Sequence, residues 1–372
     1  MSTAALAPQG VGLLASSGQG PGSAGLSEAL ARLGLATWCD IERRESAGSA
    51  QITVRLTAAA FAELCPGFDT LGLPARLARH GLSADAHSLE REVWVALLAA
   101  PQRIDFDSLQ DLQAHVRVRC NIARAADKTA LAFKTTDAAE RPDAYWHYRE
   151  DVGFLLQPDA GLVDALVAAT QPERTGRLYD FSCYRATEYV ILLGLAQEAQ
   201  HSDPEFYACL EASARQTCIK SGRFHEVFLI EQGSLEAPIP MRFYVPGDRV
   251  WFKNPDPASS DISGYEGSWV IYLGAGLFSN FWKLGQHFTL EAKALEVYHW
   301  RHGVFRDPAA ELQIDENVVE ARVLATQADA AQYAQVLQQM NRYRDPTGVY
   351  QDGGCIDATR EFPRPLSRIR LD

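Results

Sequence analysis

The chain has 372 residues, of which 47% are apolar and 22% are charged, a composition typical of a folded protein with room for one large domain or two of medium size. Its formal net charge is −12, and without a run of Lys or Arg it offers no basic surface for nucleic acid or anionic lipid. The most apolar run, residues 189–196, is far shorter than a bilayer-crossing helix, so we expect no nucleic-acid partner and no membrane span.

Cysteine usage favours a reducing compartment. The seven cysteines are Cys39, Cys65, Cys120, Cys183, Cys209, Cys218 and Cys355. An odd number of dispersed cysteines without a CxxC pair argues against a disulfide framework and against a zinc site. No phosphate-binding loop occurs, and no GxGxxG motif follows a predicted strand. We therefore predict a cytoplasmic protein that needs neither a metal nor another cofactor.

The chain divides into a leader, an extension and a main domain. Residues 1–25 are small and apolar but lack a basic start and a compact hydrophobic block, which predicts a disordered leader rather than a signal peptide. From Ser27 the spacing of apolar residues predicts a helix, and residues 51–56, QITVRL, alternate like a half-buried strand. We interpret residues 26–100 as a small α/β extension that precedes a main domain over residues 101–372.

The main domain begins with helical patterns and continues with strand patterns. Asp107 or Ser108 can cap a helix that runs to about Ala126, and residues 130–136 and 144–150 indicate a strand pair around a polar turn. Further helices are predicted at 161–170, 205–218, 289–303 and 328–343, and strands at 225–232, 241–245, 248–254, 267–274 and 277–285. Helices ahead of a mostly stranded half favour the α+β class.

The segment YDFSCYRATEYVILLGL, residues 179–195, places Cys183 at the start of a helix. Asp180 or Ser182 can cap that helix, so that free N–H groups and the positive end of the helix dipole face the sulfur, and Arg185 adds a cation. Such surroundings favour the thiolate, which is the reactive form of cysteine. The alternative is a buried thiol that acts only as a small apolar side chain. Cys183 is therefore a candidate nucleophile.

Several segments together carry a family resemblance. They are RIDFDSLQDLQAHVRVRCNIARAA, YWHY, FSCYRATEYVILLGL, GDRVWFKNPDP, YEGSWVIYLG and DATREFPRPLSRIRL. Their order, over residues 103–303 and the tail, resembles the bacterial calcium-independent protein-glutamine γ-glutamyltransferases, the transglutaminases of spore coats. The resemblance implies a papain-like fold related to the NlpC-type cell-wall peptidases, with Cys183 as nucleophile at a helix N-terminus packed on an antiparallel sheet.

The reaction implied by this resemblance is acyl transfer through a thioester. The Cys183 thiolate attacks the carboxamide of a protein glutamine, ammonia leaves, and a lysine amine takes up the acyl group to form an isopeptide cross-link. With water in place of the amine, the same site deamidates glutamine. The implied partners are proteins with accessible Gln and Lys side chains, and no cofactor takes part.

Two helper positions of the family differ in this chain. The family assists its Cys with a Glu on the strand after the Asn-Pro loop and with a His at the start of the next strand, and these positions hold Ser268 and Asn280. Glu266 lies two residues before Ser268 and would share its face of a strand, so it is a candidate substitute. Asn280 can orient a reacting group but cannot serve as a general base.

A histidine elsewhere in the chain can supply the missing base. His225 is expected to open a strand of the same sheet and to face the thiol, and His287 follows the strand of Asn280. His299 and His302 lie three residues apart on one helical face, a spacing that also suits a metal, although no carboxylate nearby in sequence completes a site.

Three hypotheses of function follow. The first is an active transferase or deamidase that uses Cys183. The second is a catalytically silent relative that serves as a binding or scaffold protein, because both helper positions differ. The third is a cysteine peptidase, since a thiol with one base suffices for either acyl acceptor.

Overall fold

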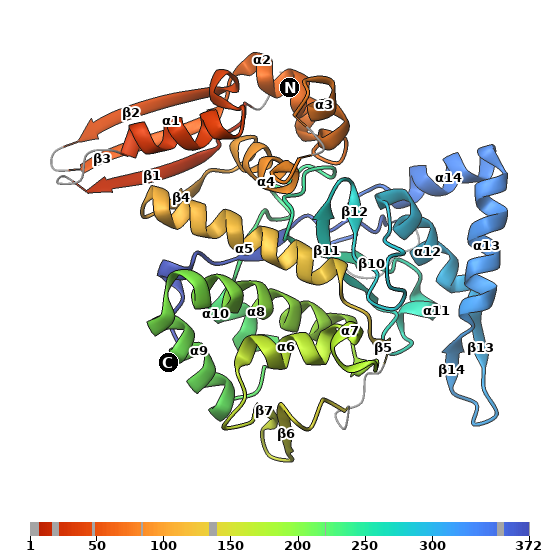
Figure 1. Ribbon diagram of the computed structural model, residues 1–372. Coiled ribbons are helices and arrows are strands. Elements are labelled where there is room, and N and C mark those ends of the chain that lie inside the picture. The colour runs from red at the N-terminus through yellow and green to blue at the C-terminus, as the bar shows by residue number, and fades with distance from the viewer. Residues whose placement is uncertain are drawn as a thin grey trace.

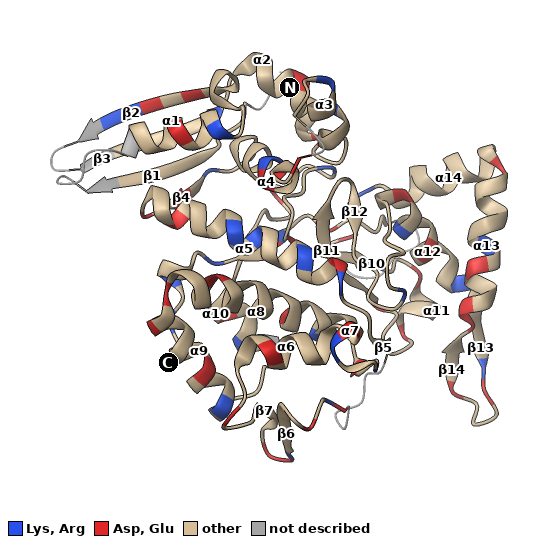
Figure 2. Cartoon of the chain, in the orientation of Figure 1, with Lys and Arg blue, Asp and Glu red and all other residues tan. Residues whose placement is uncertain are grey.

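The computed structural model describes residues 7–16, 22–46, 49–82, 85–133, 140–219, 221–347 and 353–371. Figure 1 shows three parts: an N-terminal sheet with its helices, a group of helices in the middle, and a second sheet with the C-terminal helices at the far side. Acidic and basic residues are interspersed over all three parts in Figure 2. No helix in the described ranges is long and apolar enough to cross a bilayer. The mixture of helix and sheet is that predicted from the sequence.

The N-terminal part is a four-stranded sheet in the order β2-β3-β1-β4, with helices beside it. Its elements are β1 (Val11–Ser16), β2 (Cys39–Ser46), β3 (Ser49–Leu56), β4 (Ile104–Phe106), α1 (Gly22–Arg32), α2 (Ala58–Leu64), α3 (Leu73–Arg79) and α4 (Ser88–Leu98). Ile52, Val54 and Leu56 of β3 are buried, as their alternation predicts. β4 comes from the predicted main domain and pairs in parallel with β1, so the sheet spans the predicted boundary at residue 100.

The leader predicted over residues 1–25 is structured in part. It contains β1 and the first turn of α1, which begins before the predicted cap Ser27. The GxGxxG pattern of residues 20–25 therefore does follow a strand, contrary to expectation. Its setting differs from that of a dinucleotide-binding unit, in which the next strand along the chain lies parallel to the first. Here the chain continues into the antiparallel pair β2 and β3, with β3 antiparallel to β1, and only the later β4 pairs with β1 in parallel.

The second sheet has five strands in the order β12-β11-β10-β15-β9, and its neighbouring pairs are antiparallel. The strands are β9 (Leu229–Gln232), β10 (Arg249–Lys253), β11 (Gly267–Gly274), β12 (Leu277–Phe278) and β15 (Arg360–Pro363). β10 and β11 form where strands are predicted, with Trp251 opposite Trp269 and their rings stacked at 5.6 Å. β15 inserts between β10 and β9, so the C-terminal tail completes the sheet.

Two long helices pack on this sheet. α5 (Leu109–Asp127) begins after Ser108, whose Oγ accepts a hydrogen bond from the Asp111 N–H at 3.1 Å, so the cap is Ser108 and not Asp107. α8 (Cys183–Ser202) packs against α5, and both helices contact β11. The helices around them are α6 (Leu162–Thr170), α7 (Pro172–Thr175), α9 (Pro204–Gln216) and α10 (Ser221–Phe228).

Several predicted strands are wrong. Residues 225–228 belong to helix α10, and residues 241–245 form no strand. The predicted pairing of 130–136 with 144–150 is replaced by β5 (Ala132–Phe133) with β8 (Asp180–Phe181) and by β6 (Trp146–Arg149) with β7 (Gly153–Leu156). Aromatic and β-branched residues favour a half-buried pleated surface in general, and tertiary contacts decide whether and with which partner it forms.

The C-terminal part adds helices and a hairpin beyond the second sheet (Figure 1). Its elements are α11 (Pro257–Ser260), α12 (Leu290–Gly303), β13 (Val304–Arg306), β14 (Leu312–Ile314), α13 (Glu316–Ala328) and α14 (Ala330–Met340). α12 follows the predicted cap Thr289, whose Oγ1 accepts the Ala292 N–H at 3.1 Å. α13 falls outside the predicted helices, because its apolar residues are spread around the helix instead of along one face.

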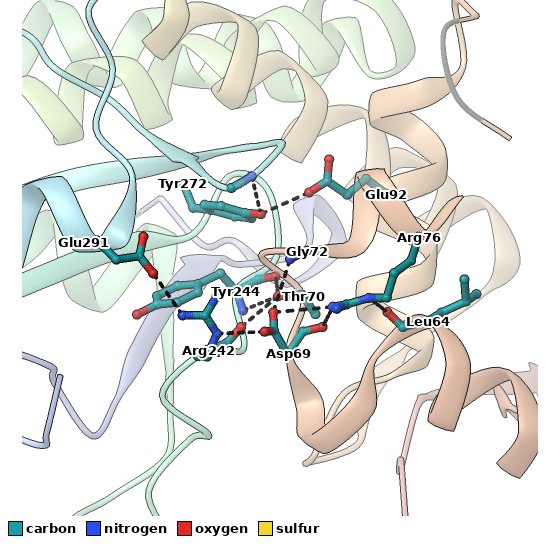
Figure 3. Close-up of polar contacts among 11 residues, drawn as sticks. Leu64, Asp69, Thr70, Gly72, Arg76, Glu92, Arg242, Tyr244, Tyr272 and Glu291 are labelled. Carbon is teal, nitrogen blue, oxygen red and sulfur yellow. Dashed lines mark hydrogen bonds and ion pairs between the residues drawn. The ribbon is translucent and has the colours of Figure 1, made fainter. Parts of the chain in front are cut away.

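Polar contacts fasten the N-terminal part to the second sheet (Figure 3). The Thr70 hydroxyl donates to the Tyr244 carbonyl at 2.7 Å and accepts the Tyr244 N–H at 2.8 Å. Glu92 of α4 accepts hydrogen bonds from the Tyr272 hydroxyl at 3.1 Å and from the Ala275 N–H at 3.0 Å. The Glu92 contacts hold α4 against the turn between β11 and β12, and the Thr70 contacts hold the segment before α3 against the segment before β10.

Candidate active site

Cys183 is the first residue of α8, as its sequence context predicts. Ser182 is the cap, since its Oγ accepts the Arg185 N–H at 3.3 Å, whereas Asp180 lies in β8. The apolar run that follows in the helix is buried, which fixes α8 in the core. The thiol therefore stands on a rigid helix start.

The surroundings of Cys183 pull the pKa of its thiol in two directions. Burial raises this pKa above its ordinary value, although the residue is partly exposed, and the charge of Glu266 raises it further. The backbone N–H of Trp269, the ammonium group of Lys293 and the backbone N–H of Tyr184 lower it. Because burial is the largest effect, the pKa is raised overall and the neutral thiol predominates at pH 7.

Arg185 does not provide the cation expected from the sequence. Its Nη1 lies 2.7 Å from Oε2 of Glu188, a fully buried carboxylate, and also donates to the Ile219 carbonyl. The guanidinium group thereby satisfies a charge inside the helical layer, where an unpaired carboxylate would be costly. Lys293 of α12 contributes a positive charge that lowers the pKa of the thiol, although this pKa is raised overall by burial.

Cys183 opens into a cavity of about 500 Å³. β11 contributes Ser268 to its wall, the segment after β12 contributes Asn280 and His287, and α12 contributes Lys293. One face of α13 forms a further wall. A thiol on an open cavity of this size is accessible to a substrate side chain.

Ser268 and Asn280, the two residues at the altered helper positions, both border this cavity. Ser268 is 7% exposed and borders the cavity, and its hydroxyl has no hydrogen-bond partner among the residues that the structure describes, so it is available to a substrate. The Asn280 amide is occupied at both ends: Nδ2 donates to the Gln286 carbonyl at 2.9 Å, and Oδ1 accepts the Trp282 N–H at 3.1 Å. Asn280 thus holds its own loop in shape.

His287 brings an imidazole to the cavity wall. Its Nδ1 accepts the Asn280 N–H at 3.4 Å, and its Nε2 lies 2.8 Å from Oδ1 of Asp127. In the neutral ring the proton is therefore on Nε2. Of the four histidines proposed from the sequence, all within the described ranges, it alone borders the cavity. Both of its nitrogens are engaged in holding the loop.

Glu266 and His225 are placed differently from expectation. Glu266 precedes β11 and is exposed, and its Oε2 accepts the Gly264 N–H at 3.0 Å. His225 lies on α10 rather than at the start of a strand, with its Nδ1 2.9 Å from Oε1 of Glu361. Neither side chain is part of the cavity wall in the described structure. The structure thus brings Ser268 and Asn280 into the cavity of Cys183, but not Glu266 or His225.

His299 and His302 contact each other on α12, with their Nδ1 atoms 2.9 Å apart. The Nε2 of His299 lies 2.8 Å from Oγ1 of Thr326 on α13, and burial lowers the pKa of His299 to about 4. Within the described ranges, no group of three or more His, Cys, Asp or Glu side chains is arranged to hold a metal ion. These histidines therefore serve the packing of α12 against α13.

Lys293 is a candidate site residue that was not predicted from the sequence. Its side chain is 3% exposed, and its Nζ lies 2.7 Å from Oε2 of Glu296 and 3.8 Å from the centre of the Phe288 ring. In the sequence, Lys293 and Glu296 form only an ordinary i,i+3 pair on a helix. The fold turns this face of α12 towards the cavity, and no local pattern indicates that.

A family model and a solved structure are similar to this chain. The family model of protein-glutamine gamma-glutamyltransferase matches residues 75–360, which include Cys183 and the cavity. The solved structure of a transglutaminase from Geobacillus stearothermophilus, without its C-terminal extension, is similar at 16% sequence identity and a TM-score of 0.39, covering 71% of this chain and 100% of that one. A comparison with curated protein sequences gives no match. Since the family model covers well over half of its length, the chain belongs to the protein-glutamine gamma-glutamyltransferase family.

Proposed function

We propose that this protein transfers the γ-glutamyl group of protein glutamines to amines through a thioester at Cys183. Family membership supports acyl transfer on protein substrates. The observation that carries the proposal is the position of Cys183 at a helix start, beside backbone N–H groups that favour its thiolate and in front of a cavity of about 500 Å³. A sulfur placed in this way can meet an acyl donor and then an amine.

The reaction requires two displacements at one carbon. The Cys183 thiolate attacks the carboxamide carbon of glutamine, the nitrogen takes up a proton, the C–N bond breaks and ammonia leaves. An amine then attacks the thioester carbon, loses a proton, and the C–S bond breaks to restore the thiolate. The Ser268 hydroxyl, which lies in the cavity wall, is suited to hold the substrate by a hydrogen bond.

Asn280, Glu266 and His225 have different roles in this proposal. Asn280 is a positioning residue that holds the loop beside the cavity. Glu266 and His225 can assist Cys183 only after a movement towards it, because one is exposed outside the cavity and the other is paired with Glu361. The packing of α8 on the antiparallel strand β11 supports a papain-like arrangement of the nucleophile.

Incubation of the protein with casein and a fluorescent primary amine tests the proposal. We expect amine incorporation that Cys183→Ala abolishes and that Cys209→Ala, which changes an exposed cysteine, leaves intact. Release of ammonia without incorporation would assign glutamine deamidation to the same thiol. If the unaltered protein yields neither product, the proposed reaction is wrong.

A catalytically silent binding protein is the second candidate. It is favoured by the raised pKa of the Cys183 thiol and by Ser268 and Asn280 at the helper positions. Alkylation by iodoacetamide across a range of pH separates the two candidates. A Cys183 that reacts only above about pH 8.5, like an unperturbed thiol, indicates the silent protein.

A further inference from the structure

The Cys183 thiolate needs a positive partner, and the expected ones are engaged elsewhere. Arg185 pairs with Glu188 in the helical layer and is not part of the cavity wall that the described residues form, and both nitrogens of His287 are bound to Asp127 and to the backbone of its own loop. Burial alone would leave the sulfur protonated at neutral pH. A nearby cation that does not depend on an imidazole would offset part of this effect.

Lys293 is such a cation. A buried ammonium group is costly unless it is paired, and that of Lys293 is paired with Glu296 at 2.7 Å and covered by the Phe288 ring at 3.8 Å. Its side chain does not extend into bulk water, as most lysine side chains do, but borders the same cavity as Cys183. Its charge is also among the effects that lower the pKa of the Cys183 thiol.

We propose that Lys293 is the electrostatic partner of the Cys183 thiolate, in the role of the imidazolium that Asn280 cannot supply, and that Glu296 weakens the effect of its charge. Lys293 acts through the sulfur and is therefore a positioning residue. The inference rests on the proposed function for what the thiolate does, but not for how the thiolate is formed.

The other charges around the site are weaker or of the wrong sign. Glu266 opposes the thiolate. Lys283 also borders the cavity, but its side chain is 50% exposed, against 3% for Lys293, so solvent screens its charge. Glu316 adds a further negative charge at the wall formed by α13, whose acidic residues are visible in Figure 2. Lys293 is thus the buried positive charge of this cavity in the described structure.

The test follows the alkylation of Cys183 by iodoacetamide as a function of pH, with mass spectrometry to separate this cysteine from the other six. We expect Lys293→Met to slow the reaction at pH 7 roughly tenfold, as removal of a nearby opposite charge does. Lys293→Arg, which keeps a positive charge at this position, should slow the reaction less than Lys293→Met does. Glu296→Gln should accelerate the reaction, because it removes the charge that tempers Lys293. Lys283→Met is the matched control and should change nothing.

Equal alkylation profiles for the unaltered protein and Lys293→Met would overturn the inference. If circular dichroism shows that Lys293→Met is misfolded, Glu296→Gln decides, and an unchanged or slower rate in that variant also overturns it. The outcome is separate from that of the proposed function. If alkylation depends on Lys293 but no amine is incorporated, the transferase proposal is wrong and the ion pair of Lys293 with Cys183 is supported. If amine is incorporated but alkylation does not depend on Lys293, the transferase proposal is supported and the ion pair is wrong.

Discussion

Glu92 gives the protein a pH-dependent stability whose size follows from its surroundings. The residue lies on α4, is 5% exposed, and accepts hydrogen bonds from Tyr272 and Ala275 (Figure 3). Burial raises the pKa of Glu92 from 4.5 to about 7, against the opposing effect of these hydrogen bonds. At roughly 1.4 kcal/mol per pH unit, ionised Glu92 costs the folded state about 3 kcal/mol.

The sign of the effect is set by which state holds the proton. Because the pKa of Glu92 is higher in the folded protein, the folded state binds more protons between pH 4.5 and about pH 7. The stability from this group is fully present below pH 4.5 and is lost as the pH rises through about 7. Glu92→Gln keeps the shape and an oxygen acceptor but cannot ionise. Relative to the unaltered protein, the variant should gain about 3 kcal/mol of unfolding free energy between low and high pH.

Urea unfolding followed by tryptophan fluorescence, in steps from about pH 5 to about pH 8, measures this difference. Glu90→Gln on the same helix is the matched control. Burial raises the pKa of Glu90, but hydrogen bonds from Arg32 and His87 outweigh it and lower this pKa overall. The stability from Glu90 is therefore lost as the pH falls, which is the opposite sign. Curves for the unaltered protein and Glu92→Gln that run parallel over this range would refute the reasoning.

Two further variants test the packing beneath the site. Gly194→Ala brings a Cβ within 2.4 Å of Cγ1 of Ile122, where α8 meets α5. This variant should lower the free energy of unfolding by about 1 to 3 kcal/mol. Gly222→Ala is its control, because no atom lies within 4 Å of the added Cβ. Asp248→Ala leaves Arg119 buried without its partner at 2.7 Å and should cost about 3 to 5 kcal/mol. Urea midpoints measure both, and a change below about 0.5 kcal/mol in Gly194→Ala or Asp248→Ala would contradict the packing described.

Local signals predicted the features that depend on one stretch of chain. Ser108, Ser182 and Thr289 cap α5, α8 and α12 because each side chain satisfies a backbone N–H within the next turn. Such a cap needs no information from the rest of the fold. The position of Cys183 at a helix start could therefore be predicted from a few residues around it.

Features that depend on distant contacts could not be predicted in the same way. Residues 225–228 include strand-forming types, yet they lie in α10, where the tilted rings of Phe224 and Phe228, four residues apart, contact each other with ring centres at 4.9 Å. The approach of Lys293 to Cys183 likewise depends on tertiary packing, of α8 on β11 and of α12 on the neighbouring strand β10. Neither helix propensity nor the spacing of apolar residues predicts which helix faces come together. The place of Lys293 in the cavity wall therefore could be seen only in the structure.

One strand connects the N-terminal part of the protein to the thiol. Near the start of β11, Ser268 borders the cavity and the Trp269 N–H favours the Cys183 thiolate. At its end, the turn after Gly274 is held by Glu92 of α4. α4 is itself buried in the core of the N-terminal sheet, and the family match, which begins at residue 75, includes α4 but not β1, β2 or β3. The N-terminal sheet therefore buries the helix that fixes one end of β11, and its packing supports the strand on which half of the site is built.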